Sequence, residues 1–178
     1  MKKVIYRIWQ WTWGLPQSIL GLALYLRWRH CPHFEHHGAL ATQWGARGGI
    51  SLGMFLFVPA PQNQSVRPDA PAPGTRARYE HTLFHEYGHT LQSLLLGPLY
   101  LVVIGIPSWL WCNLPPLRRL RKERGIPYDS FYVERWATAW GEWMARRAGD
   151  REKSSRFFKK SFIFVETSTD LSGNSMLQ

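Results

Sequence analysis

The pentapeptide His85-Glu86-Tyr87-Gly88-His89 places two histidines four residues apart, with a glutamate directly after the first. On an α-helix, residues four apart lie one above the other on one face, so both imidazoles can bind a single metal ion. Zn²⁺ accepts such nitrogen ligands, and Glu86 can then act as general base on a metal-bound water. Because zinc lowers the pKa of a bound water to about 7, hydroxide forms at neutral pH. The pattern predicts metal-assisted hydrolysis, most often of a peptide bond.

The segment around the pentapeptide has the signals of one continuous helix. The Pro/Gly-rich residues 71–75 mark its start and Gly97-Pro98 its end. One interior glycine, Gly88, costs a helix only about 1 kcal/mol. Apolar residues flank the motif at helical rather than alternating spacing, namely Leu83, Phe84, Leu91, Leu94 and Leu95. We therefore expect two half-buried ligands on a packed helix, in preference to two surface histidines and a solvated glutamate.

A catalytic zinc site has three protein ligands and leaves one position open, so a third ligand is needed. The two cysteines, Cys31 and Cys112, are isolated and give no support to a Cys₄ site. Residues 127–142 predict a second helix, with Asp129 or Ser130 as its N-cap. The third ligand is expected on this helix.

Glu134 is the first candidate for that ligand, because a buried carboxylate is costly unless it is paired or coordinates a metal. Its neighbours on the helix are apolar, namely Phe131, Val133, Trp136 and Ala137. An ordinary ion pair of Glu134 with Arg135 or Lys122 is the alternative. Glu142 is the second candidate, although Arg146 offers it an i,i+4 ion pair.

An H-E-x-x-H helix followed by a glutamate on a later helix resembles the arrangement of gluzincin-type zinc metallopeptidases. Four segments are also similar to those of a group of small bacterial membrane-associated proteins: 85–93, 96–101, 104–108 and 132–137. The resemblance covers residues 48–141. It implies Zn²⁺ as cofactor, with His85, His89 and Glu134 as ligands and Glu86 as base. It also implies an aspartate where Thr138 stands, so the carboxylate that would orient a ligand histidine is replaced here.

Charge and tryptophan content point to an anionic membrane. The net charge is +10 and the pI about 10.1, which favours either a membrane surface or nucleic acid as partner. The chain has ten tryptophans, a residue type enriched where membranes meet water. No RNP-like, zinc-finger or helix-turn-helix signature is present in the sequence, so no nucleic-acid partner is expected. With the resemblance, this predicts association with the bacterial inner membrane.

Two uncharged segments are long enough to enter a bilayer. The first, 8–26, follows a basic start as a signal peptide would, but no small-x-small cleavage site comes after it. We expect an uncleaved anchor or interfacial helix over 1–29. The second, 93–114, is about as long as a spanning helix needs to be. A full crossing would put His89 and Glu134 on opposite sides of the membrane.

Gly97-Pro98 and Gly105-Ile106-Pro107 can break a helix in the second segment. We therefore expect a re-entrant or interfacial hairpin, or a buried core, over 93–114. An intramembrane protease whose motif helix lies in the bilayer would need a ligand in a later apolar segment, and the sequence shows none.

Upstream of the motif, residues 48–58 predict a strand weakened by Gly53, and residues 39–44 can pair with it.

The edge of such a strand binds extended substrates in zincin-like enzymes, and an ordinary core strand is the alternative. The histidines of residues 30–37 predict a solvated loop rather than a metal site, and 59–75 a polar loop or lid. The expected fold is α+β and mainly helical: a zincin-like core with a short β-hairpin before the motif helix, and membrane-associated helices.

We expect three regions: 1–29 as anchor, 30–148 as metal-binding domain with the apolar hairpin 93–114, and 149–178 as a basic, then polar tail. The predicted function is a membrane-associated zinc metallopeptidase with a peptide or protein substrate. Tyr128 or Tyr132 would stabilise the oxyanion. The alternative is a non-catalytic membrane protein in which the motif is structural or degenerate.

Overall fold

The computed structural model describes residues 3–46, 48–60, 75–147 and 149. The chain divides into two compact units, Met1–Glu142 and Trp143–Gln178. In the second, the Arg147 guanidinium lies over the Trp143 ring, 4.3 Å from its centroid. The tail predicted over 149–178 lies outside the described residues apart from Gly149, and so does most of the loop predicted over 59–75.

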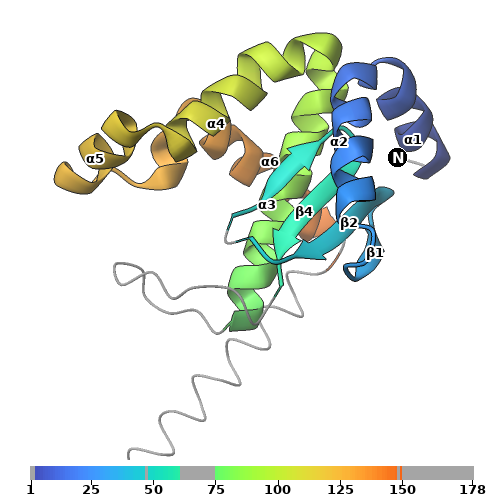
Figure 1. Ribbon diagram of the computed structural model, residues 1–178, viewed down its shortest axis with the longest axis horizontal. Helices are drawn as coiled ribbons and strands as arrows, with labels where there is room; N and C mark the ends of the chain where they lie inside the picture. The colour runs from blue at the N-terminus through green and yellow to red at the C-terminus, as the bar shows by residue number, and fades with distance from the viewer. Residues whose placement is uncertain (1–2, 47, 61–74, 148, 150–178) are drawn as a thin grey trace, which may run out of the picture. The chain divides into compact units, whose positions relative to one another are not determined.

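The described residues form six α-helices and one four-stranded sheet, so the prediction of a mainly helical α+β fold is confirmed (Figure 1). The helices are α1 (Lys3–Thr12), α2 (Leu15–Arg27), α3 (Thr75–Leu96), α4 (Ile106–Asn113), α5 (Pro115–Glu123) and α6 (Tyr132–Arg147). The strands are β1 (His33–His36), β2 (Ala39–Trp44), β3 (Ile50–Leu52) and β4 (Phe55–Pro59). Short turns η2 (Gly97–Leu99), η3 (Leu101–Gly105) and η4 (Tyr128–Ser130) complete the order.

The sheet has the strand order β1-β2-β4-β3 and is mixed. β1 pairs antiparallel with β2, β2 parallel with β4, and β3 antiparallel with β4. The single strand predicted over 48–58 is wrong, because Gly53 has φ +59° and turns the chain between β3 and β4. The predicted pairing of 39–44 with this region exists, but as the parallel β2–β4 ladder. The histidine-rich segment contributes β1 instead of a loop.

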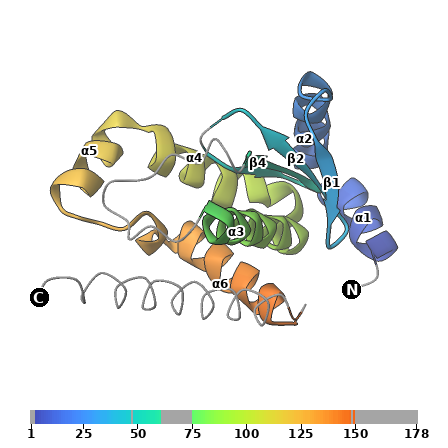
Figure 2. The ribbon, with the colours of Figure 1, turned by 90° about the horizontal axis from the view of Figure 1, so that it is seen from below.

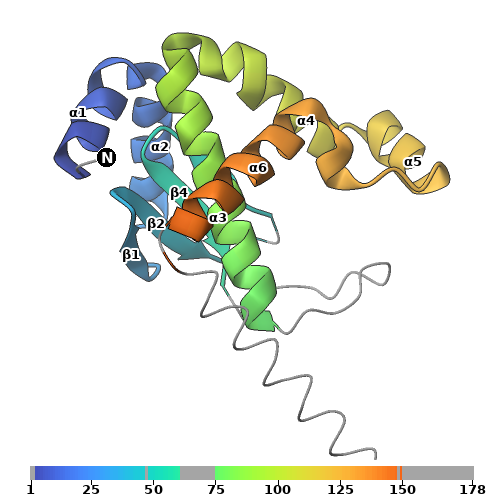
Figure 3. The same ribbon diagram turned by 180° about the vertical axis from the view of Figure 1, so that it is seen from behind.

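Both faces of β4 are covered, and all five of its residues are buried. Helix α2 packs on one face of the sheet and α3 on the other, as Figure 2 shows from below and Figure 3 from behind. On the α2 side, Gly21 brings the helix backbone against Phe55. On the α3 side, Ser51 of β3 reaches Glu86 of the motif. The sheet therefore supports the motif helix directly, as a strand buried on both sides does in layered α/β packing.

The N-terminal segment forms two helices rather than one, with a turn at Gly14 between α1 and α2. The segment 93–114 is likewise divided, because Gly97 has φ +53° and ends α3. A π-helical turn, η3, then leads into α4 at Ile106. Within the described ranges, none of the helices combines the length and the apolar character needed to cross a membrane.

The motif helix is confirmed over Thr75–Leu96, with its end at Gly97 as the sequence predicts. The second predicted helix forms as α6 but begins at Tyr132. The prediction of Asp129 or Ser130 as its N-cap is therefore wrong. Both lie in η4, where the Ser130 hydroxyl donates to the carbonyl of Pro127 at 2.8 Å.

Candidate metal centre

Helices α3 and α6 cross in backbone contact because each has a glycine at the crossing. A Cβ on Gly88 of α3 would overlap the carbonyl group of Ala137, and a Cβ on Gly141 of α6 would overlap the carbonyl group of Phe84. Helices normally stay about 8–10 Å apart because side chains separate them. Because neither glycine has a side chain, the two helices approach closely. The first turns of α6 therefore lie against the face of α3 that carries the two histidines.

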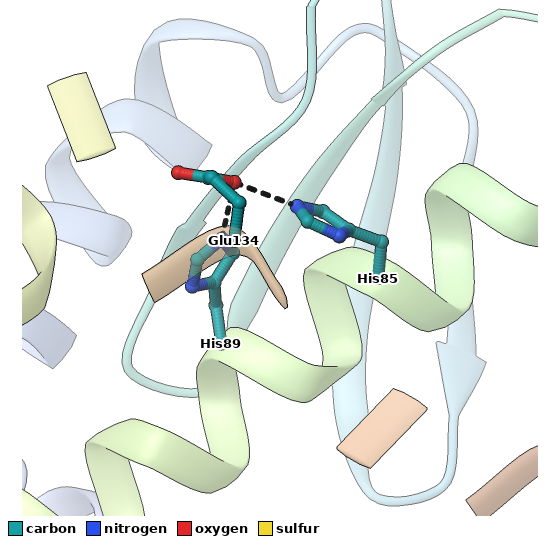
Figure 4. Close-up of side chains that lie close together, drawn as sticks. All are labelled: His85, His89 and Glu134. Atoms are coloured by element: carbon teal, nitrogen blue, oxygen red, sulfur yellow. Dashed lines mark hydrogen bonds and ion pairs between the residues drawn. The ribbon is translucent and has the colours of Figure 1, made fainter. Parts of the chain in front are cut away.

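This crossing brings His85, His89 and Glu134 together (Figure 4). Glu134 Oε2 lies 3.1 Å from Nε2 of His85 and 3.4 Å from Nε2 of His89. The Glu134 side chain is fully buried, and those of His89 and His85 are 6 % and 11 % exposed. One candidate ligand atom from each residue lies within 4.8 Å of the others. Among the described residues, this is the group of histidine, cysteine and acidic side chains that lie close enough together to hold a metal ion. Glu142, the second candidate for the third ligand, does not belong to it.

Each histidine is oriented through its second ring nitrogen. Gln92 donates from Nε2 to the carbonyl of Val133 at 3.0 Å, which directs its Oε1 towards His89 Nδ1 at 2.7 Å. Since Oε1 only accepts, Nδ1 of His89 carries a proton, and Nε2 on the other edge of the ring faces Glu134. His85 Nδ1 lies 2.9 Å from the hydroxyl of Thr138. Thr138 therefore fills the orienting position where the resemblance implies an aspartate.

The carboxylate of Glu134 is ionised and incompletely satisfied. Burial alone would raise its pKa, but hydrogen bonds from His85 and His89 outweigh burial and hold the pKa well below its usual range. Burial would lower the pKa of His89, and the hydrogen bond with Glu134 and the charge of Glu86 raise it instead. Oε1 of Glu134 is buried without a hydrogen-bond partner. A buried anionic oxygen of this kind is costly unless a cation balances it.

Glu86 is held by a residue of the neighbouring strand. The hydroxyl of Ser51 lies 2.6 Å from Oε2 of Glu86 and 2.7 Å from its backbone carbonyl. Gly49 makes room for this carboxylate, since a Cβ there would overlap it. Both Ser51 and Glu86 are buried. The sequence contains no pattern for these contacts, because they join residues 35 or more positions apart through the β3–α3 packing.

Tyr128 lies at the site and Tyr132 lies away from it. The Tyr128 ring centroid is 6.4 Å from that of His85. Burial, and then the charge of Glu134, raise the pKa of Tyr128 well above its usual value, so the phenol stays protonated. The Tyr132 side chain is 47 % exposed and its hydroxyl donates to the carbonyl of Val103 at 3.0 Å. The structure thus separates the two tyrosines that the sequence left equivalent.

The histidines of residues 30–37 lie elsewhere. His36 packs edge-on against the rings of Phe84 and Tyr87, and His33 Nδ1 lies 3.0 Å from the hydroxyl of Thr42. Neither belongs to the group of potential metal ligands found among the described residues. Cys31 and Cys112 do not form a disulfide.

Comparison with known proteins gives no family assignment. No protein-family model matches the chain, and neither a curated protein nor a solved structure matches it. The gluzincin resemblance therefore stands on the buried triad of His85, His89 and Glu134 alone.

Proposed function

We propose that this protein is a zinc-dependent hydrolase, and specifically a metallopeptidase with a zincin-like core. The observation that carries the proposal is the buried triad, in which two imidazoles meet one oxygen of a carboxylate whose other oxygen has no partner. Two histidines and one glutamate are the ligand set of catalytic zinc sites, and they leave one coordination position for substrate or water. His85, His89 and Glu134 fit this role because both Nε2 atoms point to the same oxygen.

When bound, zinc would supply a nucleophile at neutral pH by lowering the pKa of a water molecule to about 7. The chain's own groups then divide the remaining work. Glu86 takes up the proton, and the buried hydrogen bond from Ser51 keeps its carboxylate in one orientation. The protonated phenol of Tyr128 donates to the oxygen on which negative charge develops. The proposed mechanism therefore uses Glu86 as the general base and Tyr128 as the group that stabilises the oxyanion.

A peptide substrate is supported by the position of β3. This strand lies at an edge of the sheet, and its Ser51 and the preceding Gly49 contact Glu86. An extended peptide that paired with the edge of β3 would place its backbone beside the general base. A small compact substrate would not use this edge.

A second function is favoured by one observation, the near-complete burial of the triad. Structural zinc sites are closed, whereas catalytic ones keep an open position. In this alternative, the metal fixes α6 against α3 and the protein has no hydrolytic activity. The same group of residues would then stabilise the fold.

Metal content and hydrolysis together test the proposal. We expect about one zinc per purified chain in the wild type, in Glu86→Gln and in the matched control Glu142→Gln. Zinc should be lost from His85→Ala and from Glu134→Gln. Wild type and Glu142→Gln should cleave a quenched-fluorescent peptide library, and Glu86→Gln should not. A wild type without zinc would refute the metal site, and zinc without cleavage would establish the structural alternative.

A further inference from the structure

The outward faces of α1 and α2 are apolar, whereas their inward faces are polar. Val4, Ile5 and Ile8 of α1 are 67 %, 51 % and 58 % exposed, while Gln10 of the same helix is completely buried. On α2, the leucines and isoleucine at positions 15, 19 and 20 are exposed, and Gln17 and Ser18 are buried. A surface helix in water has the reverse arrangement, with its apolar stripe towards the core.

The buried polar side chains hold the helices to α3. Gln10 Nε2 donates to the carbonyl of Thr90 at 3.0 Å, and Gln17 Nε2 lies 2.8 Å from the hydroxyl of Ser93. Ser93 in turn donates to Oε1 of Gln10 at 3.0 Å. Helices inside a bilayer are joined in this way, by small residues and by hydrogen bonds between polar side chains. The arrangement indicates that apolar surroundings, not water, face these two helices.

A second apolar segment, residues 95–109, continues the same surface. Leu99, Val102, Ile106 and Trp109 are each more than half exposed, while Ile104 between them is buried. The segment is joined to the N-terminal helices at its start. The Trp9 indole donates to the carbonyl of Leu94 at 3.2 Å, and a Cβ on Gly97 would overlap the Trp13 ring.

We call the outward faces of α1, α2 and residues 95–109 the apolar surface. Of the large apolar side chains that are exposed in the described ranges, all but two lie within 4–26 and 95–114. The exceptions are Tyr132 and Trp143. Figure 3 shows that the start of the second segment lies beside the turn between α1 and α2. Monomeric proteins in water rarely expose a continuous apolar area of this kind, so a partner covers it.

A basic helix adjoins the apolar surface and identifies the partner. Helix α5 follows α4 directly and packs against it. Its side chains Arg118, Arg119 and Lys122 are exposed, as is Arg124 just after it. Lipid headgroups of an anionic membrane complement this charge, because basic residues near the surface are attracted to the negative potential of such a membrane. A second copy of the same chain, with its net charge of +10, would instead bring like charges together.

We propose that the apolar surface binds one leaflet of an anionic lipid bilayer. The outward side chains of α1, α2 and residues 95–109 enter the boundary between headgroups and acyl chains, and α5 contacts the phosphates. This is interfacial binding by several short helices, for which buried apolar area and charge add. It extends beyond the proposed function, because it holds whether or not the metal site is catalytic.

Vesicle flotation of the purified full chain tests this surface. The vesicles contain phosphatidylcholine alone or phosphatidylcholine with phosphatidylglycerol, at low and high salt. Wild type should float with the anionic vesicles and lose affinity as salt rises. The triple variant Ile8→Gln/Val102→Gln/Ile106→Gln should bind at least about tenfold more weakly. Its control is Ala139→Gln, an exposed position on α6, which should bind as wild type does.

A charge-reversal pair tests the contribution of α5 separately. Arg118→Glu/Arg119→Glu should lower the affinity for anionic vesicles by about tenfold or more and remove most of its salt dependence. Binding to phosphatidylcholine alone should change little. Arg135→Glu, at an exposed position of α6, is the control and should retain the wild-type affinity.

Three results would overturn the proposal. The first is a wild type that does not float with anionic vesicles. The second is a triple variant that keeps its circular dichroism and binds as wild type does. The third is a wild-type dimer that the triple variant converts to a monomer, which would mean that a second copy covers the surface. If the triple variant fails to fold, the proposal is tested on the wild type instead. Its tryptophan fluorescence is then measured with vesicles whose acyl chains carry bromine, which quenches tryptophans that enter the bilayer. Quenching is expected from Trp9 and Trp109, and its absence would refute the insertion.

Discussion

Gln92 fixes the orientation of His89 while being tied to the opposite helix. Its Oε1 lies 2.7 Å from His89 Nδ1, and its Nε2 donates to the carbonyl of Val133, the residue before Glu134. One buried amide thus sets the ring angle of one candidate ligand and the position of the backbone that carries another. The candidate metal site depends on contacts between α3 and α6 as much as on the three candidate ligands themselves.

Replacing Gln92 with methionine should weaken zinc binding by about 10- to 100-fold, as loss of a group that orients a ligand histidine does. Methionine has a similar volume but cannot accept the proton of His89 Nδ1. Zinc affinity is measured by competition with a chromogenic chelator. Gln43→Met is the matched control, because Gln43 bonds the hydroxyl of Tyr79 away from the site. Equal affinities in the two variants would contradict the assigned role.

Gly88→Ala should destabilise the protein although alanine is the better helix former. The intrinsic gain is about 1 kcal/mol, whereas the overlap of the new Cβ with the Ala137 carbonyl group forces backbone movement that costs about 1–3 kcal/mol. Because α6 must then move away from α3, zinc content should fall as well. Urea unfolding and metal analysis measure the two effects.

The control for Gly88→Ala is Gly45→Ala, where no atom lies within 4 Å of the added Cβ. This variant should keep the wild-type zinc content. A Gly88→Ala protein with full zinc and unchanged stability would show that the two helices do not need their backbone contact.

Ser51→Ala should lower kcat of the proposed peptidase by about 10- to 100-fold, the effect of losing about 1.5–3 kcal/mol from a hydrogen bond to a charged group. KM and zinc content should change little, because the Ser51 hydroxyl bonds Glu86 rather than the triad and the substitution leaves the backbone edge of β3 unchanged. Thr12→Ala removes an exposed hydroxyl that bonds only its own helix, and it serves as control. A loss of zinc in Ser51→Ala would instead assign the serine a structural role.

Acid should destabilise the fold through His36. Burial, and then the nearby His37, lower the pKa of His36 from 6.5 to about 3. Between these two values the unfolded chain binds a proton that the folded chain does not, so stability falls as pH decreases from about 6.5 to about 3. In His36→Phe this contribution is absent. The free energy of unfolding, measured with urea at pH 7 and pH 5, should therefore change less in the variant than in the wild type.

The control is Phe34→Leu, a substitution in the same strand β1 that removes no titratable group. Its pH dependence should match that of the wild type. If His36→Phe retained the full pH dependence, other groups would be responsible for the acid sensitivity.

The sequence predicted the local part of the site and missed the part that depends on tertiary contacts. The spacing of His85 and His89 needs only a helix, and the cost of burying Glu134 pointed to the carboxylate that lies beside the two histidines. Gln92 and Ser51 carry no pattern of their own, because their roles arise only where α3 meets α6 and β3. The strand prediction over 48–58 failed because the positive φ of Gly53 allowed a tight turn where a run of apolar residues suggested continuity.

The hydrogen bonds of Gln10 and Gln17 with α3 make the N-terminal helices part of the interior of the fold. Tyr6 of α1 stacks on Tyr87 of the motif itself, with ring centroids 6.2 Å apart. A chain shortened by its first 27 residues would uncover Tyr87 and Phe55 and remove the hydrogen bonds of Gln10 and Gln17 with Thr90 and Ser93. Helices α1 and α2 are therefore part of the interior that supports the motif helix, and a variant without them should lose stability in the same region as the candidate metal site.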